Sequence, residues 1–250
     1  MKIKNKTGCE MMKKFLKIII LSFIIVFILF SIWSLNPLGP MKEAKEILNS
    51  NNEGIQIENT SNIVFKPQKY ETGLIFYPGG RVDPKSYSIF AEKLAEEDIL
   101  VIIAKMPFNL AIFNSYKADK IIQDYPEVKN WYISGHSLGG AMAAKYVYEN
   151  PDKIKNLILY AAYPAENNDL SNSNINVLSI YAENDGLANQ EKIKNNKQYL
   201  PDSTKYVEII GGNHAQFGYY GEQEGDNPSQ ISREEQTKII IQNTLNFIKK

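Results

Sequence analysis

Residues 131–144 read WYISGHSLGGAMAA, and this stretch decides the fold. Its first four residues form a short apolar run typical of a buried strand, whereas the residues from Leu138 onward are small and favour a helix. Between the two lies Gly135-His-Ser-Leu-Gly139, a G-x-S-x-G sequence. A serine on a sharp strand-to-helix turn is exposed at the edge of a sheet. The stretch therefore predicts that Ser137 is a nucleophile, with a structural Gly-rich turn as the alternative.

The chain from residue 73 onward alternates short apolar runs with longer amphipathic runs. This alternation indicates strands separated by helices, and hence an α/β fold with a mainly parallel sheet and helices on both faces. The predicted strands are Gly73–Tyr77, Ile99–Lys105, Trp131–Ser134, Leu157–Ala161, Val177–Tyr181 and Tyr206–Ile210. The predicted helices are Pro84–Glu97, Tyr116–Asp124, Leu138–Glu149, Gly186–Tyr199 and Ser232–Lys249.

The chain has only two histidines, which restricts the choice of a general base. His136 belongs to the turn itself, and its side chain should point away from that of its neighbour Ser137. His214 follows the last predicted strand through two glycines and an asparagine, a loop that can carry an imidazole over the edge of the sheet. We therefore predict His214 as the base; a surface histidine in a loop is the alternative, although loops at strand ends often carry function.

The strand, serine and helix, with a histidine after the last strand, resemble the α/β-hydrolase superfamily from about Gly73 to the C-terminus. The resemblance implies an acid after a later strand, and Asp185 matches that position in the turn after Val177–Tyr181. Glu183 in the same turn is the competitor, and a helix N-cap is the alternative role of Asp185. The acid of such a triad holds the imidazole tautomer and stabilises the imidazolium.

The resemblance also implies an oxyanion hole made of two backbone N–H groups. The first belongs to the residue after the nucleophile, here Leu138. The second comes from the loop after an early strand, which reads Tyr77-Pro-Gly-Gly-Arg81 and replaces the family's common His-Gly start with Pro-Gly. Gly80 is the predicted second donor, with Arg81 as the alternative.

Three side chains are predicted to bind substrate: Arg81, Tyr163 and Phe217. Arg81 either binds an acidic group of the substrate or forms an ion pair with Asp83 on the surface. Only about 15 residues separate the strand that ends near Ala161 from the next one, which leaves no room for a cap domain. The open pocket is similar to the lidless, dienelactone-hydrolase-like branch, but the best-known members of that branch have Cys in place of the nucleophilic serine, so their lactone substrate is not carried over.

The segment from His214 to Ser232 is long for a connection in a compact domain, and it carries Glu222, Glu224 and Asp226 among glycines. Such length suggests a functional loop, and a solvated acidic loop is the alternative. Two histidines and one cysteine disfavour a zinc site, and there is no GxxxxGK[ST] loop for phosphate. No cofactor or metal is expected. The balance of 28 basic and 28 acidic side chains disfavours a nucleic-acid partner.

The N-terminal segment is apolar enough to cross a bilayer. Phe15 to Leu35 supplies 21 positions with only Lys17 charged, and a spanning helix needs about 20 mostly apolar residues. Lysines precede this run, so the positive-inside rule predicts a single-pass cell-membrane protein with a cytoplasmic N-terminus. A cleaved secretory signal is the alternative, but no small-x-small cleavage site follows the run.

These features predict four regions: a basic cytoplasmic tail (1–14), a transmembrane signal-anchor (15–35), a stalk (36–62) with a short helix at Met41–Leu48, and an α/β-hydrolase domain (63–250). The predicted function is a membrane-anchored serine hydrolase that cleaves a carboxylic ester or related acyl bond of a small molecule outside the cytoplasm. An acyltransferase of the cell envelope and a non-catalytic exported binding domain are the alternatives. The sequence does not indicate an oligomeric state.

Overall fold

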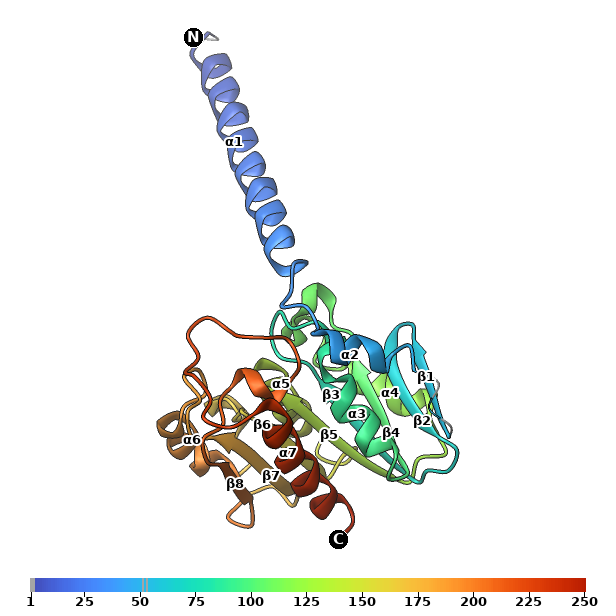
Figure 1. Cartoon of the computed structure of the whole chain (residues 1–250). Helices are drawn as coiled ribbons and strands as arrows, with labels where there is room; N and C mark the ends of the chain where they lie inside the picture. The colour runs from blue at the N-terminus through green and yellow to red at the C-terminus, as the bar shows by residue number, and fades with distance from the viewer. Residues whose placement is uncertain (1–2, 51, 53) are drawn as a thin grey trace. The chain divides into compact units, whose positions relative to one another are not determined.

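The computed structural model describes residues 3–50, 52 and 54–250, which form two units (Figure 1). The first unit ends at Pro37 and contains helix α1 (Ile3–Ser34). The second unit runs from Leu38 to Lys250 and holds every described strand. Residues 1 and 2 of the predicted basic tail, and residues 51 and 53 of the predicted stalk, lie outside the described residues.

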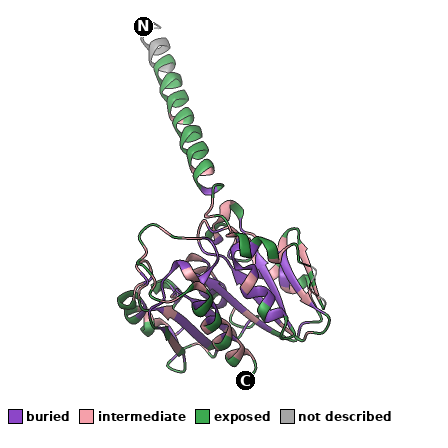
Figure 2. Ribbon diagram, viewed as in Figure 1, coloured by how far each residue is buried: buried purple, intermediate pink, exposed green. Residues whose placement is uncertain are grey.

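Helix α1 is apolar along most of its length. Its part from Glu10 to Ser34 is long and apolar enough to cross a membrane, and most of its large hydrophobic residues are exposed (Figure 2). A signal sequence near an N-terminus meets the same criteria of length and composition. The apolar run of the sequence is thus part of a single continuous helix.

The second unit is built on one eight-stranded sheet with the order β1-β2-β4-β3-β5-β6-β7-β8. Strands β3 to β8 all run parallel to one another, whereas β2 is antiparallel to both β1 and β4. The six predicted strands are all confirmed, with ends shifted by at most two residues. They are β3 (Thr72–Tyr77), β4 (Ile99–Ala104), β5 (Asn130–His136), β6 (Asn156–Tyr160), β7 (Asn176–Ala182) and β8 (Lys205–Ile209).

Strands β1 (Ile55–Asn59) and β2 (Asn62–Pro67) were absent from the sequence-based prediction. The stretch 36–62, expected as a stalk, therefore contributes to the sheet, and it also contains helix α2 (Lys42–Ile47). Leu38 forms a bridge with Val82, and Ile55 and Ile57 pack against the core. The folded unit accordingly begins about 25 residues before the predicted boundary at residue 63, because an Asn-rich composition concealed a half-buried edge strand.

The remaining helices agree with the alternating pattern of the sequence. The long helix expected over Pro84–Glu97 is divided into a 3₁₀ turn, Pro84–Tyr87, and helix α3, and the one expected over Gly186–Tyr199 begins later, after an Asn189 N-cap. Ser232 accepts the N–H of Glu235 as the N-cap of the last helix. The helices are α3 (Ser88–Ala95), α4 (Lys117–Asp124), α5 (Leu138–Glu149), α6 (Gln190–Asn196) and α7 (Arg233–Ile248).

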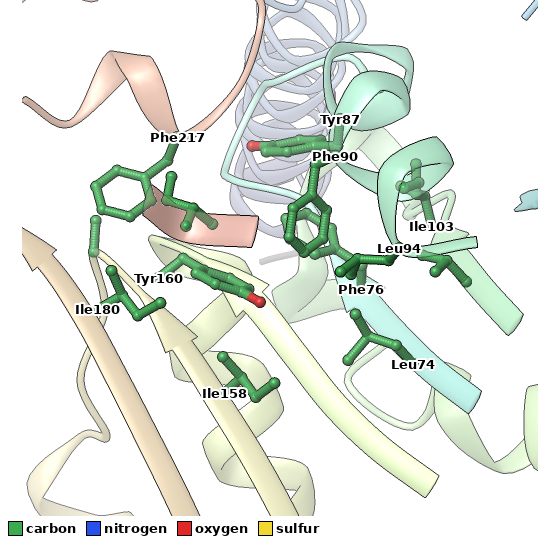
Figure 3. Close-up of a cluster of buried hydrophobic side chains, with 14 of the residues drawn as sticks. Leu74, Phe76, Tyr87, Phe90, Leu94, Ile103, Ile158, Tyr160, Ile180 and Phe217 are labelled. Atoms are coloured by element: carbon green, nitrogen blue, oxygen red, sulfur yellow. The ribbon is translucent and has the colours of Figure 1, made fainter. Parts of the chain in front are cut away.

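The sheet buries both of its faces. Alternate residues of β3 point to opposite sides, so Leu74 and Phe76 join one hydrophobic cluster while Ile75 and Tyr77 join the other. Helices α3 and α7 cover the first cluster, part of which Figure 3 shows, and helices α4 and α5 cover the second. The near-continuous apolar strands follow from this double burial. No helical cap interrupts the chain between β6 and β7, where the described residues form only a short 3₁₀ turn.

We expect the segment from Leu38 to Asn59 to be required for the stability of the domain. Removing it would expose the edge of β2 and withdraw half-buried aliphatic side chains, which contribute about 1 kcal/mol each. A chain that begins at Asn62 should therefore unfold at least ~10 °C below one that begins at Leu38 in thermal denaturation followed by circular dichroism. Equal melting temperatures would show that the segment is a stalk after all.

Candidate active site

Ser137 occupies the tight turn between β5 and α5. Its backbone has φ 52° and ψ −123°, a region that non-glycine residues rarely adopt. Such a conformation costs of order 1–3 kcal/mol and persists only when its surroundings enforce it. The sequence prediction that this serine is held on a strained strand-to-helix turn agrees with the backbone observed.

The glycines around Ser137 are required by close approaches of the backbone. A Cβ atom on Gly135 would lie 2.6 Å from the carbonyl oxygen of Gly139, and one on Gly139 would lie 2.6 Å from the carbonyl carbon of Tyr77. Gly140 is equally confined, because its Cβ would lie 2.7 Å from the oxygen of Gly135. Side chains at these positions would push α5 away from the sheet, so the G-x-S-x-G-G sequence allows the helix to begin against the strands.

The predicted base and acid are joined by a buried hydrogen bond. His214 Nδ1 and Asp185 Oδ2 are 2.7 Å apart, and the two side chains are at most 1% exposed. His214 lies in the loop after β8, and Asp185 lies in the turn after β7. The other ring nitrogen of His214, Nε2, is buried and has no hydrogen-bond partner among the described residues.

The environment of Asp185 distinguishes it from the competing Glu183. Asp185 Oδ1 accepts the N–H groups of Leu187 and Ala188 at 2.8 and 2.7 Å, so both carboxylate oxygens are engaged. Glu183 is exposed and accepts the N–H of Gly211, away from the imidazole. The N-cap of α6 is Asn189 rather than Asp185. Of the two carboxylates in the turn, only Asp185 contacts His214.

Ser137 opens into a cavity of about 210 Å³. The cavity is lined by Ser137, Leu138, Ala141, Ala161, Ala162, Tyr163, Leu187 and Ala188. Leu187 and Ala188 are the residues whose N–H groups hold Asp185, so the segment that carries the acid and the turn that carries the serine border the same space. Larger cavities exist elsewhere on the domain, among them a polar one of about 370 Å³ beside Asn213 and Ala215, but Ser137 does not line it.

The three predicted substrate-binding residues lie in different surroundings. Tyr163 lines the cavity of Ser137. Phe217 is only 6% exposed and stacks on the ring of His136, with ring centroids 5.5 Å apart and planes at 16°, so it is part of the core and does not line that cavity. Arg81 lies in the loop after β3 with φ 57° and does not line the cavity either. Asp83, its suggested partner, accepts the N–H of Lys85.

The backbone hydrogen bonds of the loop after β3 bear on the choice of oxyanion donor. The N–H of Gly79 donates to the Tyr87 hydroxyl at 3.0 Å, and the N–H of Arg81 donates to the carbonyl of Asn109 at 2.8 Å. The N–H of Gly80 has no partner among the described residues, and a Cβ atom on Gly80 would lie 3.1 Å from the side chain of Leu138. As the first residue of α5, Leu138 also has an N–H without an intrahelical acceptor.

The loop after His214 is held in place by one of its acidic residues. Asp226 accepts the N–H of Gly186 at 3.0 Å through Oδ1 and the N–H of Ala215 at 2.8 Å through Oδ2. Gly186 directly follows Asp185, and Ala215 directly follows His214. Asp226 therefore links the loop of Asp185 to the loop of His214, a role that the sequence did not reveal because the stretch Gly225-Asp-Asn-Pro228 has the composition of a solvated turn.

Arg233 is a second residue of this region that the sequence analysis missed. Its guanidinium donates to the carbonyls of Ala215, Gly218 and Gly221, so the loop wraps around a half-buried cation at the start of α7. Burial lowers the pKa of the guanidinium, which stays charged at neutral pH. Within residues 3–50, 52 and 54–250, no three His, Cys, Asp or Glu side chains are grouped to hold a metal ion.

A serine on a strand-to-helix turn, a buried imidazole–carboxylate pair after later strands and a mainly parallel sheet define the class of α/β serine-hydrolase folds. The chain matches the family described as "Alpha/beta hydrolase family" over residues 73–238, and it belongs to that family. The match spans the sheet from β3 onward and every residue of the site described above. No curated protein matches the chain.

Solved structures with this fold include several esterases and lipolytic enzymes. Est1E from Butyrivibrio proteoclasticus is 16% identical, with a TM-score of 0.53 over 79% of this chain and 100% of its own. A CIB-like hydrolase from Thermoplasma acidophilum is 14% identical, with a TM-score of 0.54 over 77% and 98%. A structure of the metagenome-derived lipolytic enzymes LipS and LipT is 12% identical, with a TM-score of 0.58 over 78% and 99%. At this identity the likeness shows the shared fold.

We expect Asp226→Asn to destabilise the protein, because an amide nitrogen would replace one of the two oxygens that accept the N–H groups of Gly186 and Ala215. Leaving a backbone N–H without its acceptor costs about 1–3 kcal/mol. Glu224→Gln, an exposed change two residues away in the same loop, is the matched control and should leave the free energy of unfolding in urea unchanged. Equal urea midpoints for the two variants would contradict the bridging role of Asp226.

Proposed function

We propose that the protein is a serine hydrolase that cleaves a carboxylic ester or a related acyl bond through an acyl-enzyme. The buried hydrogen bond between His214 Nδ1 and Asp185 carries this proposal. It fixes the tautomer in which Nδ1 holds the proton, so that Nε2 is left as a base. Family membership and the esterase-like structural neighbours support the same reaction class.

In the proposed reaction, Ser137 attacks the carbonyl carbon of the substrate while His214 Nε2 takes the hydroxyl proton. The carbonyl π bond opens as the Oγ–C bond forms, and the N–H groups of Leu138 and Gly80 stabilise the negative oxygen. His214 then gives its proton to the leaving alcohol as the C–O bond breaks, which leaves the acyl-enzyme. A water molecule, deprotonated by the same imidazole, then attacks the acyl-enzyme. The bond to Ser137 Oγ breaks, the imidazole returns its proton to Oγ, and the carboxylic acid product is released. Each oxyanion donor typically contributes a factor of about 10²–10³ in kcat.

The surroundings of Ser137 suggest the size of the substrate. A cavity of about 210 Å³ bordered by alanines fits a compact acyl group, and Tyr163 at its border offers an aromatic contact. The short segment between β6 and β7 supports assignment to a lidless branch, of which the dienelactone-hydrolase-like proteins are one example. A structure of the neighbour Est1E has ferulic acid bound. We propose a small ester as substrate, with Arg81 next to Gly80 in the sequence as a contact for an acidic group.

We further propose that α1 is an uncleaved signal-anchor, which would make the protein a single-pass membrane protein with an extracytoplasmic catalytic domain. The lysines before the apolar run and the lack of a small-x-small site after it support this topology. The length of the helix is sufficient for a bilayer.

A fluorophosphonate probe should label Ser137, and Ser137→Ala should lose both labelling and hydrolysis of p-nitrophenyl esters, by a factor of at least ~10³. Ser203→Ala, at an exposed serine of the same chain, is the control and should behave as the unaltered protein. Labelling is read by intact mass and located by peptide mapping. A folded protein that stays unlabelled, or a Ser137→Ala variant that keeps its activity, would refute the proposed function.

The anchor proposal predicts that the full chain, expressed in a bacterial cell, stays in the membrane pellet after alkaline carbonate extraction and keeps the mass of the uncleaved protein. External protease should digest the hydrolase domain once the layers outside the cytoplasmic membrane are permeabilised and while that membrane is intact, because the domain lies outside the cytoplasm. A mature N-terminus located after the apolar run, with the protein in the soluble fraction, would establish the secretory-signal alternative instead.

A further inference from the structure

The loop after β3 contains two consecutive glycines, so its conformation needs an external constraint. The carbonyl of Gly79 accepts the N–H of Val82 at 3.1 Å, and the N–H of Gly79 donates to the Tyr87 hydroxyl at 3.0 Å. The Gly79 carbonyl and the Gly80 N–H belong to one planar trans peptide and point in opposite directions. The two hydrogen bonds of Gly79 thus determine where the Gly80 N–H points.

Tyr87 provides this constraint from inside the core. Its side chain is 1% exposed, and its ring packs beside Phe76 and Phe90 in the cluster shown in Figure 3. Burial raises the pKa of the phenol well above its usual range, so it keeps its proton at all physiological pH values. The loop after β3, called the glycine loop for its Gly79 and Gly80, is therefore in contact with a rigid, neutral hydroxyl.

The second partner of the Tyr87 hydroxyl is the ring of His136, the residue between Gly135 and Ser137. The oxygen of Tyr87 and Nδ1 of His136 are 2.9 Å apart. Because that oxygen already accepts the Gly79 N–H, donating its own proton to Nδ1 satisfies all three buried groups. The loop also rests on the imidazole itself, since a Cβ atom on Gly79 would lie 2.8 Å from Nδ1.

His136 remains neutral in this position. Burial is the main cause that holds its pKa well below the usual range, and the neighbouring His214, whose ring centroid is 4.6 Å away, acts in the same direction. A neutral ring can accept a hydrogen bond from the Tyr87 hydroxyl, and it places no positive charge beside His214. The chain of contacts thus runs from the turn that carries Ser137, through one imidazole and one phenol, to the glycine loop.

We propose that Tyr87 and His136 are positioning residues of the active site, which aim the Gly80 N–H at the developing oxyanion by fixing the backbone of Gly79. The inference deepens the proposed function and rests on it. Neither side chain lines the cavity of Ser137, so both act through the loop rather than on the substrate.

Tyr87→Phe tests this role by removing one oxygen atom. The Gly79 N–H and His136 Nδ1 lose their shared partner, and the Gly80 N–H becomes poorly aimed. We expect kcat for p-nitrophenyl esters to fall about 10- to 100-fold, a large part of the loss that follows removal of a whole oxyanion donor. KM should change less than about twofold, because the negative charge on the carbonyl oxygen is absent from the bound substrate and develops only as Ser137 attacks. The full chain in detergent is used throughout.

Tyr160→Phe is the matched control, because it also removes a buried phenol oxygen from the same hydrophobic cluster. The Tyr160 hydroxyl bonds to Thr244 of α7, 2.9 Å away, and not to the glycine loop. Loss of either hydroxyl should lower the melting temperature by a similar amount, whereas only Tyr87→Phe should lower kcat. His136→Asn, which keeps an acceptor near the position of Nδ1, should retain more kcat than His136→Leu.

The outcomes separate this inference from the proposed function. An active unaltered enzyme with equal kcat values for Tyr87→Phe and Tyr160→Phe overturns the positioning role and leaves the hydrolase standing. Equal kcat values for the folded His136→Asn and His136→Leu variants overturn the part assigned to His136. An unaltered protein that neither hydrolyses esters nor reacts with a fluorophosphonate overturns both proposals. The inference is supported if kcat falls for Tyr87→Phe and not for Tyr160→Phe, and if His136→Asn retains more kcat than His136→Leu.

Discussion

The close contact between helix α5 and the end of strand β3 is the constraint on which the site depends. Gly139 lies directly against the carbonyl groups of Tyr77 and Pro78, with no room for a Cβ atom. Tyr77 and Pro78 lead immediately into the glycine pair, so the same contact places the start of α5 beside the loop that carries Gly80. Backbone packing thereby places Ser137 and Leu138 beside this loop, and the hydrogen bonds of Gly79 determine how the loop presents the Gly80 N–H.

The sequence predicted the parallel strands, where burial on both sides produces a long apolar run. Strand β2 is also buried on both sides, but its apolar run is only Ile63–Phe65 and it was missed. The strands from β3 to β8 are apolar runs between turn residues, and each was predicted within two residues. Strand β1 was missed because it is an edge strand with charged and polar residues at alternate positions, preceded by asparagines. Its position depends on pairing with β2, and hence on a long-range antiparallel contact that local composition does not encode.

The site was predictable to the extent that its chemistry is rare in the chain. With two histidines, elimination left His214 as the base, and the contact with Asp185 joins two residues that the sequence had named. Composition could not separate Asp185 from Glu183, since both lie in one turn and only the backbone determines which carboxylate faces inward. The position of Phe217 in the core, and the link made by Asp226, likewise depend on how two loops meet and not on residue type.

Burial of the His214–Asp185 pair imposes a requirement on its neighbours. An ionised carboxylate inside a protein is stable only when hydrogen bonds replace its hydration. Asp185 obtains three such hydrogen bonds, from Leu187, Ala188 and His214. The ring of His136 lies 4.6 Å from that of His214, centroid to centroid, and burial lowers the pKa of His136 so that this neighbour is uncharged. Burial also raises the pKa of the Tyr87 phenol, so the two buried groups next to the pair add no charge to it.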